Sequence, residues 1–94
     1  MASINITAVI RAKEGLGNKL KEELKKVQVL SQQEEGNIKY DLYQSDEHTF
    51  VFQEEWATKE ALKNHAQAAH FLEYRDRSQD LVLDREVYML KKVE

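Results

Sequence analysis

The sequence of 94 residues contains no cysteine, no proline and only three glycines. The absence of cysteine excludes disulfides, thiolate nucleophiles, cysteine-ligated zinc and iron–sulfur clusters, and it agrees with a reducing compartment such as the cytoplasm. Hydrophobic residues make up 41% of the sequence and charged residues 33%. This composition, together with the low content of proline and glycine, is typical of an ordered domain without linkers. We therefore expect residues 1–94 to form one small domain.

The sequence also lacks a strong charge excess and a long hydrophobic run. Its 14 basic and 17 acidic residues give a net charge of −3, which disfavours binding to nucleic acid or to an anionic membrane surface. No stretch approaches the 18 apolar residues of a membrane span, and the N-terminus does not resemble a secretion signal. Motifs for dinucleotides, nucleoside triphosphates and serine hydrolases are missing. We expect a cytoplasmic protein with no membrane partner.

The residues that are present follow two clear periodicities in the first half. Apolar and polar residues alternate from Ile4 to Lys13, which predicts a β-strand. Leucine and valine then recur every three or four residues from Leu16 to Leu30, which predicts an amphipathic helix. Gly36 is placed to end this helix.

The second half predicts three further strands and one interrupted helical region. Apolar and polar residues again alternate as they do in strands, and the polar residues 44–48 indicate a hairpin between the strands at 38–43 and 49–56. Apolar positions in the helical region do not follow one stripe, so we expect a break near Ala69 and His70, with Thr58 as the N-cap. The expected strands span residues 38–43, 49–56 and 86–93, and the helical region runs from Lys59 to about Leu83.

This order of elements, βαββαβ, is the ferredoxin-like α+β pattern with a four-stranded antiparallel sheet in the order 4-1-3-2. Two helices can cover only one face of such a sheet. The third strand nevertheless carries apolar residues on both faces, with Phe50 and Phe52 on one and Val51 on the other. We expect a second copy of the chain to cover the other face in a twofold homodimer.

Several segments resemble the antibiotic biosynthesis monooxygenase family of small dimeric α+β barrels. The segment Phe50–Trp56, followed by Ala61-Leu62, His65 and His70-Phe71, carries most of the resemblance, and Glu34–Leu42 and Arg11–Gly15 are also similar. Members of the family include quinol and anthrone oxygenases, haem-degrading proteins and a sugar-phosphate isomerase. The resemblance implies a cofactor-independent monooxygenase that oxidises a quinol or polycyclic phenol with molecular oxygen.

Three residues are candidates for the catalytic site. Glu54 and Trp56 lie two apart on one strand, so their side chains share a face, and the resemblance implies that they and His65 border a ligand cavity. A neutral imidazole is a natural base for a phenol or quinol, which assigns that role to His65. Structural roles stay open for all three: a core aromatic for Trp56, a buried ion pair for Glu54 and a cap for His65.

Six further residues are expected to contact the substrate: Asn5, Thr7, Phe52, His70, Phe71 and Tyr74. The five-residue separation of His65 and His70 does not place two imidazoles side by side on one helix, so we expect no metal and no other cofactor. Haem degradation is disfavoured because the family's first-strand asparagine would fall nearer Ala8 than Asn5.

Two alternatives to the monooxygenase remain. One is a non-catalytic dimer that binds a small ligand or takes part in a stress response. The other is an isomerase of a small phosphorylated carbonyl compound, which needs cations in the cavity; the candidates for these are Arg11, Arg75 and Arg77.

Overall fold

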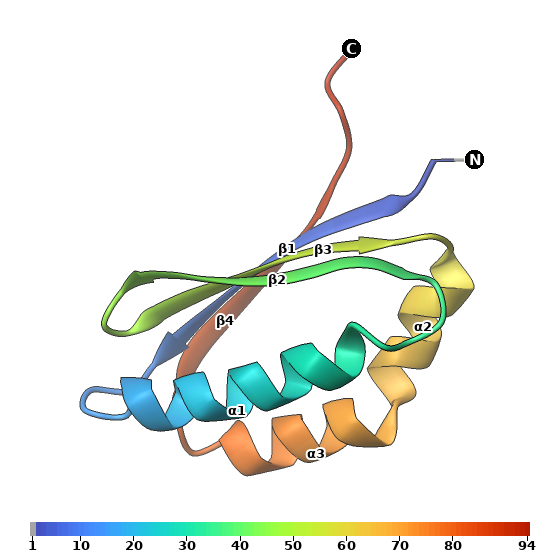
Figure 1. Ribbon diagram of the computed structural model, residues 1–94. Coiled ribbons are helices and arrows are strands. Elements are labelled where there is room, and N and C mark those ends of the chain that lie inside the picture. Colours follow the sequence, from blue (N-terminus) through green and yellow to red (C-terminus); the bar gives the residue numbers. More distant parts are fainter. Residues whose placement is uncertain (1) are drawn as a thin grey trace.

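The computed structural model describes residues 2–94 and contains the expected order of strands and helices, with the second helical region divided into two helices (Figure 1). The elements are β1 (Ile4–Ala12), α1 (Gly17–Ser31), β2 (Asn37–Asp46), β3 (Thr49–Trp56), α2 (Lys59–Gln67), α3 (Ala69–Ser78) and β4 (Val82–Leu90).

The four strands form one sheet in the order β2-β3-β1-β4, and every neighbouring pair is antiparallel. This confirms the ferredoxin-like α+β fold and the predicted strand order. Ile6 of β1 lies opposite Glu54 of β3, and Ala8 lies opposite Phe52. Because alternate residues of a strand share a face, this register places all four side chains on the same side of the sheet.

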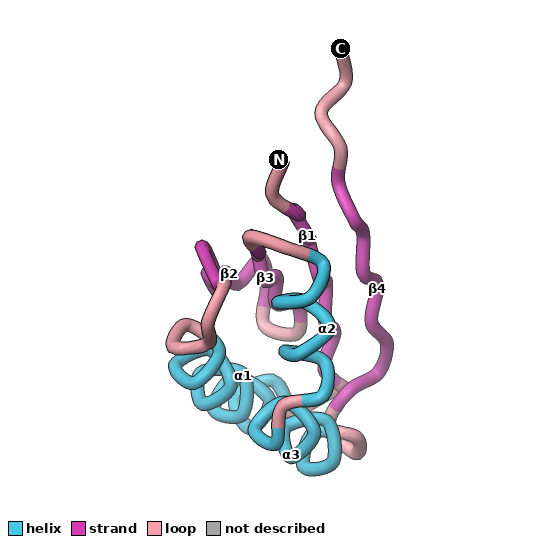
Figure 2. The backbone as a smooth tube through the Cα atoms, turned by 90° about the vertical axis from the view of Figure 1, so that its right-hand side faces the viewer, coloured by secondary structure: helices cyan, strands magenta, loops and turns pink. Residues whose placement is uncertain are grey.

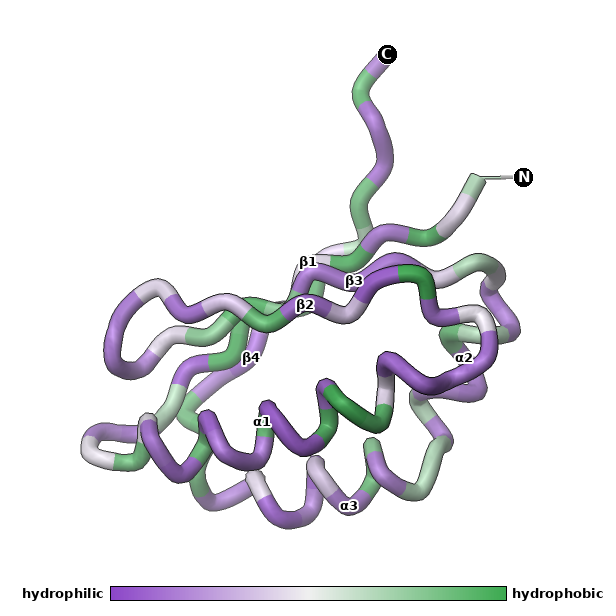
Figure 3. The backbone as a smooth tube through the Cα atoms, viewed as in Figure 1, coloured by the Kyte–Doolittle hydropathy of each residue, from purple (hydrophilic) through white to green (hydrophobic). Residues whose placement is uncertain are grey.

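That side of the sheet is covered by the helices, and the core lies between the two layers (Figures 1 and 2). The expected apolar stripe of α1 is confirmed at Leu20, Leu24 and Val27, which are buried, whereas Leu30 at its end is exposed. Figure 3 shows hydrophilic residues along most of the helix and a hydrophobic stretch near its C-terminal end. From the sheet, Phe50 and Trp56 are fully buried against this layer. The two strongest sequence patterns therefore meet in one core.

The second helical region and the last strand differ from the expected boundaries. Helix α3 ends at Ser78 rather than near Leu83, and β4 starts at Val82 rather than Glu86. Pairing with β1 explains the difference, because the Lys13 amide donates to the Leu81 carbonyl at 2.9 Å and Ala12 lies opposite Val82. The hydrogen bonds of the sheet edge thus extend the last strand back through residues 82–85, where the sequence predicted the end of the helical region and a short connection.

No helix or strand within residues 2–94 covers the other face of the sheet (Figure 2). Its exposed apolar side chains include Tyr43, Tyr88 and Leu90, with Val9 and Val51 half-buried between them. Figure 2 shows the helices gathered on one side only. Within residues 2–94, no helix combines the length and the apolar character needed to cross a membrane.

Candidate functional site

A cavity of about 150 Å³ lies between the sheet and helices α2 and α3. Its wall is mainly apolar, with Ile6, Ala8 and Phe52 contributed by the sheet. Six polar or charged residues interrupt this wall: Tyr40, Glu54, His65, Tyr74, Arg75 and Arg85. An apolar cavity with a few convergent polar groups is the usual form of a small-molecule site.

Strand β3 brings Glu54 into the cavity because the strand alternation places it in line with Phe52 and Trp56. The Glu54 side chain accepts a hydrogen bond at Oε1 from Trp56 Nε1, at 3.0 Å. Burial raises the pKa of the Glu54 carboxyl, and the Trp56 hydrogen bond only partly opposes this. Glu54 therefore keeps its proton to a higher pH than a surface glutamate does.

Helix α2 positions His65. Thr58 caps the helix, with its hydroxyl oxygen accepting from the Ala61 amide at 3.0 Å, as the sequence predicts. Ala61 and His65 are four residues apart, so they share the one buried face of this short helix. The His65 side chain is 4% exposed and lies with its ring centroid 4.6 Å from those of both Trp56 and Phe71.

The turn after α1 brings Glu34 to the same place. Helix α1 ends at Ser31, before Gly36, and Gly36 instead occupies the turn with a φ of +84°. A Cβ atom at Gly36 would lie 2.5 Å from the Ala61 Cβ, so only glycine permits this close approach to α2. The turn consequently packs against the helix that carries His65, and Glu34 lies within reach of the imidazole.

Glu34 and His65 form a carboxylate–imidazole pair. The His65 Nδ1 atom is 2.7 Å from Glu34 Oε2, which assigns the ring proton to Nδ1. The opposite nitrogen, Nε2, then carries a lone pair and lies 3.5 Å from the Tyr40 hydroxyl. Burial lowers the pKa of His65, while Glu34 raises it in part. The imidazole is thus neutral at pH 7, and its acceptor nitrogen Nε2 is approached by the Tyr40 hydroxyl, which also lines the cavity.

His70 is the second imidazole on the same carboxylate. Its Nε2 atom lies 2.7 Å from Glu34 Oε2. The helical region breaks at Ala68, whose ψ of 141° is extended, close to the break predicted near Ala69 and His70. The five-residue spacing would not place the two imidazoles side by side on one helix, but the break between the helices brings both to the same carboxylate.

Glu34, His65 and His70 could together hold a metal ion, as their ligand atoms lie within 4.8 Å of one another. Two imidazoles and one carboxylate are the ligand set of many non-haem iron sites. The three groups also satisfy one another by hydrogen bonding, since each imidazole can donate a ring N–H and the carboxylate oxygen can accept from both.

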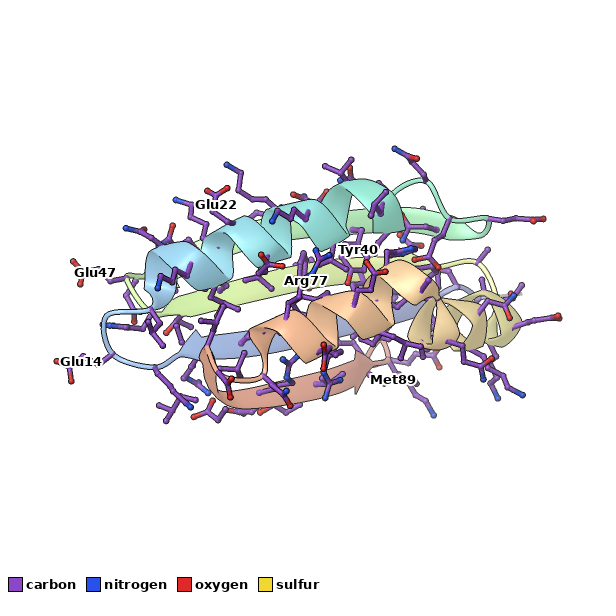
Figure 4. All side chains as sticks on the ribbon, turned by 90° about the horizontal axis from the view of Figure 1, so that it is seen from below. Glu14, Glu22, Tyr40, Glu47, Arg77 and Met89 are labelled. Atoms are coloured by element: carbon purple, nitrogen blue, oxygen red, sulfur yellow. The ribbon has the colours of Figure 1, made fainter. Side chains whose placement is uncertain are left out.

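Tyr40 completes the polar end of the cavity. It is 2% exposed, and its ring centroid lies 4.6 Å from that of Phe52 and 5.3 Å from that of His65. Burial strongly raises the pKa of the Tyr40 hydroxyl, so this group stays protonated and can donate a hydrogen bond. In Figure 4, seen from the helical side, Tyr40 lies between α1 and α3.

The structure brings most of the predicted site residues together. His65, Glu54, Phe52, Phe71 and Tyr74 line the cavity. Trp56 contacts both Glu54 and His65 without lining the cavity. His70 does not line it either and is connected to His65 only through Glu34.

Asn5 and Thr7 do not belong to this cavity. Both lie on the opposite face of the sheet, where Thr7 donates a hydrogen bond to Gln53 Oε1 at 2.6 Å. The alternation of β1 explains the correction, because Ile6 and Ala8 are the residues that face the helices.

Glu34 and Arg85 were not predicted from the sequence as residues of the site. Glu34 lies in a turn, where no periodicity specifies the direction of a side chain. Arg85 lies between the expected end of the helical region near Leu83 and the expected start of the last strand at Glu86, so its position on a sheet edge beside the cavity could not be derived.

A family model described as antibiotic biosynthesis monooxygenase matches residues 3–77. The chain belongs to this family. The match extends from β1 through most of α3, and it therefore includes Tyr40, Glu54 and His65 at the polar end of the cavity. It confirms the resemblance first seen in the segments around Trp56 and His65.

A sequence relative and two solved structures are also similar. The chain is 39% identical over 54 residues to a Bacillus subtilis (strain 168) protein named "Putative monooxygenase YcnE", a match that covers 55% of this chain and 57% of that protein, and so little more than half of either. The structure of PA3566 from Pseudomonas aeruginosa has a TM-score of 0.94 at 28% identity and covers 100% of this chain and 97% of that one. A Nitrosomonas europaea structure titled "Putative antibiotic biosynthesis monooxygenase" has a TM-score of 0.86 at 26% identity and covers 96% and 99%.

Proposed function

We propose that this protein is a monooxygenase that oxidises a quinol with molecular oxygen and uses no flavin, nicotinamide or metal. The observation that carries the proposal is the Glu34–His65 pair beside an apolar cavity. The pair holds a neutral imidazole with Nε2 unprotonated, which is the form needed to accept a proton from a phenolic hydroxyl that takes the place of the long 3.5 Å contact with Tyr40. The match to the antibiotic biosynthesis monooxygenase family also supports a monooxygenase.

The reaction needs only the quinol and oxygen. Loss of a proton to His65 Nε2 gives a phenolate, which is electron-rich enough to donate electrons to oxygen. One oxygen atom then forms a bond to a ring carbon, and the other leaves as water together with two hydrogens of the quinol, so that the product is a hydroxyquinone. The quinol is oxidised, oxygen is reduced, and no further reductant is required.

The other polar residues have roles that follow from their protonation. Tyr40 keeps its proton because burial raises its pKa, and Glu54 is shifted toward the neutral acid for the same reason. Both can donate hydrogen bonds to the negative oxygen that forms when the quinol loses its proton. The apolar wall around them excludes water, which strengthens these interactions.

The cavity volume favours a quinol over a polycyclic phenol. A cavity of about 150 Å³ is the size at which an engineered protein cavity binds benzene, so one aromatic ring fits. Pockets for drug-sized molecules usually have volumes of about 300–1,000 Å³, so a polycyclic ligand needs a larger cavity than this one.

The proposal includes a homodimer and a cytoplasmic location. The uncovered face of the sheet, with Tyr43, Tyr88 and Leu90 exposed, supports the dimer, because a second copy could bury these side chains. Such an interface should exceed about 2,000 Å² in total. Light scattering should give twice the chain mass of 11.0 kDa at micromolar concentration, and a monomer at all concentrations would contradict this part.

Oxygen consumption with a panel of single-ring quinols tests the activity. We expect uptake of one oxygen molecule per quinol consumed and a hydroxyquinone as product, identified by mass spectrometry with ¹⁸O-labelled oxygen. Label in the ring together with label in water supports the proposal. A protein that binds quinols without consuming oxygen would instead be a binding protein.

A further inference from the structure

Two arginines lie where the cavity meets the solvent. Arg75 comes from α3 and Arg85 from β4, and both line the cavity that contains His65. The same two side chains also line a neighbouring hollow in the surface, together with Gln79 and Val82. Since they border both spaces, they form the boundary between the apolar interior and the outside.

Each of these guanidinium groups is held against an aromatic ring of the cavity wall. The Arg75 Cζ atom lies 5.9 Å from the centroid of the Phe71 ring, and the Arg85 Cζ atom lies 5.5 Å from that of Tyr74. Arg85 Nη1 also donates a hydrogen bond to the Tyr74 hydroxyl at 3.2 Å. Stacking of this kind orients a guanidinium while leaving most of its N–H groups free to donate.

Neither arginine is neutralised by a carboxylate. Within residues 2–94, Arg75 and Arg85 take part in no ion pair, although Asp76 borders the same surface hollow. By contrast, Arg11 pairs with Asp84 and Glu86 on the opposite face of the sheet.

The one carboxyl group that lines the cavity is too distant to pair with Arg85. Glu54 lies opposite Ile6 of β1, and Arg85 lies opposite Ile10 of the same strand. Four residues along a strand correspond to about 13 Å. The cavity therefore has a carboxyl and an imidazole at one end and unneutralised positive charge at the other.

We infer that the ligand of this cavity is a single aromatic ring that carries an oxyanion, either a carboxylate or a phosphate ester, bound by Arg75 and Arg85. Paired guanidinium groups match the geometry of such oxyanions through parallel N–H donors. The inference rests on the proposed function in one respect: it takes this cavity as the substrate site. The oxyanion binds at the mouth, and the ring enters the apolar part with its hydroxyl toward His65.

Calorimetric titration under nitrogen, where no oxidation can occur, tests the inference with matched probes. These are 2,5-dihydroxybenzoate, its methyl ester and hydroquinone, which share the ring and differ in the negative charge. We expect the acid to bind at least tenfold more tightly than the ester or hydroquinone, and increasing salt to weaken only the acid. Benzoate and phenyl phosphate then distinguish the two oxyanions. Equal binding of acid and ester would overturn the inference.

The variants Arg75→Gln and Arg85→Gln connect the effect to these residues. Each should weaken binding of the acid by about 10- to 100-fold, the usual range for a charged hydrogen-bond partner, and leave the ester unchanged. Arg77→Gln is the matched control, because Arg77 is an exposed arginine of the same helix and pairs with Glu73 at 3.8 Å. If loss of the contact with Tyr74 destabilises Arg85→Gln, Arg85→Lys is the second variant at this position, because lysine keeps the positive charge. Unchanged acid binding in folded variants of both positions would contradict the assignment.

The outcome is distinguishable from failure of the proposed function. A protein that binds the acid through Arg75 and Arg85 but consumes no oxygen supports the inference and refutes the monooxygenase. A protein that oxidises hydroquinone, the ester and the acid with equal kcat/KM refutes the inference and supports the monooxygenase.

Discussion

Glu34 Oε2 lies 2.7 Å from His65 Nδ1 and also 2.7 Å from His70 Nε2, although 31 and 36 residues separate it from these histidines in the sequence. One carboxylate oxygen from a turn therefore orients two imidazoles from two different helices. His65 is the ring that lines the cavity, and Glu34 fixes its tautomer and orientation, so that Nε2 is the acceptor nitrogen.

The first prediction concerns His65 as the base. His65→Ala should lower quinol turnover by about 10²–10⁴-fold, the usual contribution of positioned general-base catalysis, with a much smaller loss of stability than removal of a core aromatic causes. Trp56→Ala is the contrast, since Trp56 is fully buried and its removal should cost about 3–5 kcal/mol. Oxygen uptake and thermal unfolding of both variants provide the measurements. A fully active His65→Ala protein would exclude this residue as the base.

The second prediction concerns Glu34 as a positioning residue. Glu34→Gln should reduce kcat by a factor between about 10 and 10⁴, the range found for groups that orient a functional histidine. Because the Glu34 carboxylate raises the pKa of His65, its removal should also move the acidic limb of the pH–rate profile to lower pH. A loss of rate with an unchanged pH profile would indicate a purely structural role. Glu35→Gln, at the neighbouring position in the same turn, is the control.

The third prediction concerns metal removal. If Glu34, His65 and His70 are held by hydrogen bonds alone, dialysis against a strong chelator should leave oxygen uptake and the unfolding temperature unchanged. Activity that disappears on chelation and returns with one specific metal would show instead that these three residues are ligands. His70→Gln separates the two cases further, since it preserves a hydrogen-bond donor to Glu34 but is a poor metal ligand.

The fourth prediction concerns the buried carboxyl of Glu54. Burial raises its pKa above the value of 4.5 that applies to the unfolded chain, so the folded state binds the proton more tightly. This contribution to the free energy of unfolding is complete below about pH 4.5 and is lost as the pH rises through the folded pKa. Glu54→Gln keeps an oxygen that can accept from Trp56 and has no charge to bury.

The free energy of unfolding of Glu54→Gln relative to that of the natural protein should therefore increase as the pH is raised from about 4.5. Urea unfolding at several pH values measures this difference, and Glu55→Gln is the neighbouring control on the opposite face of the strand. A difference that is constant with pH would show that Glu54 ionises in the folded protein as it does in the unfolded chain.

Local sequence patterns determined the elements and the fold. The alternation in β1 and β3 and the helical spacing in α1 each specify which side chains are buried, because the burial of apolar surface follows the period of the backbone. The same alternation placed Glu54 beside Phe52 and Trp56. These patterns, together with the predicted break in the second helical region, were enough to derive the ferredoxin-like order of elements. The family resemblance then identified His65 as a candidate for the catalytic site.

Only the tertiary structure decided the composition of the site. Glu34 reaches His65 because the Gly36 turn packs against α2, and no local pattern contains information about that contact. Arg85 faces the cavity because edge pairing with β1 makes residues 82–85 a strand. The five-residue separation of His65 and His70 did not predict adjacent imidazoles, but the extended backbone at Ala68 lets both rings contact one carboxylate. Each of these results depends on contacts between distant segments, and such contacts form only when the whole chain folds.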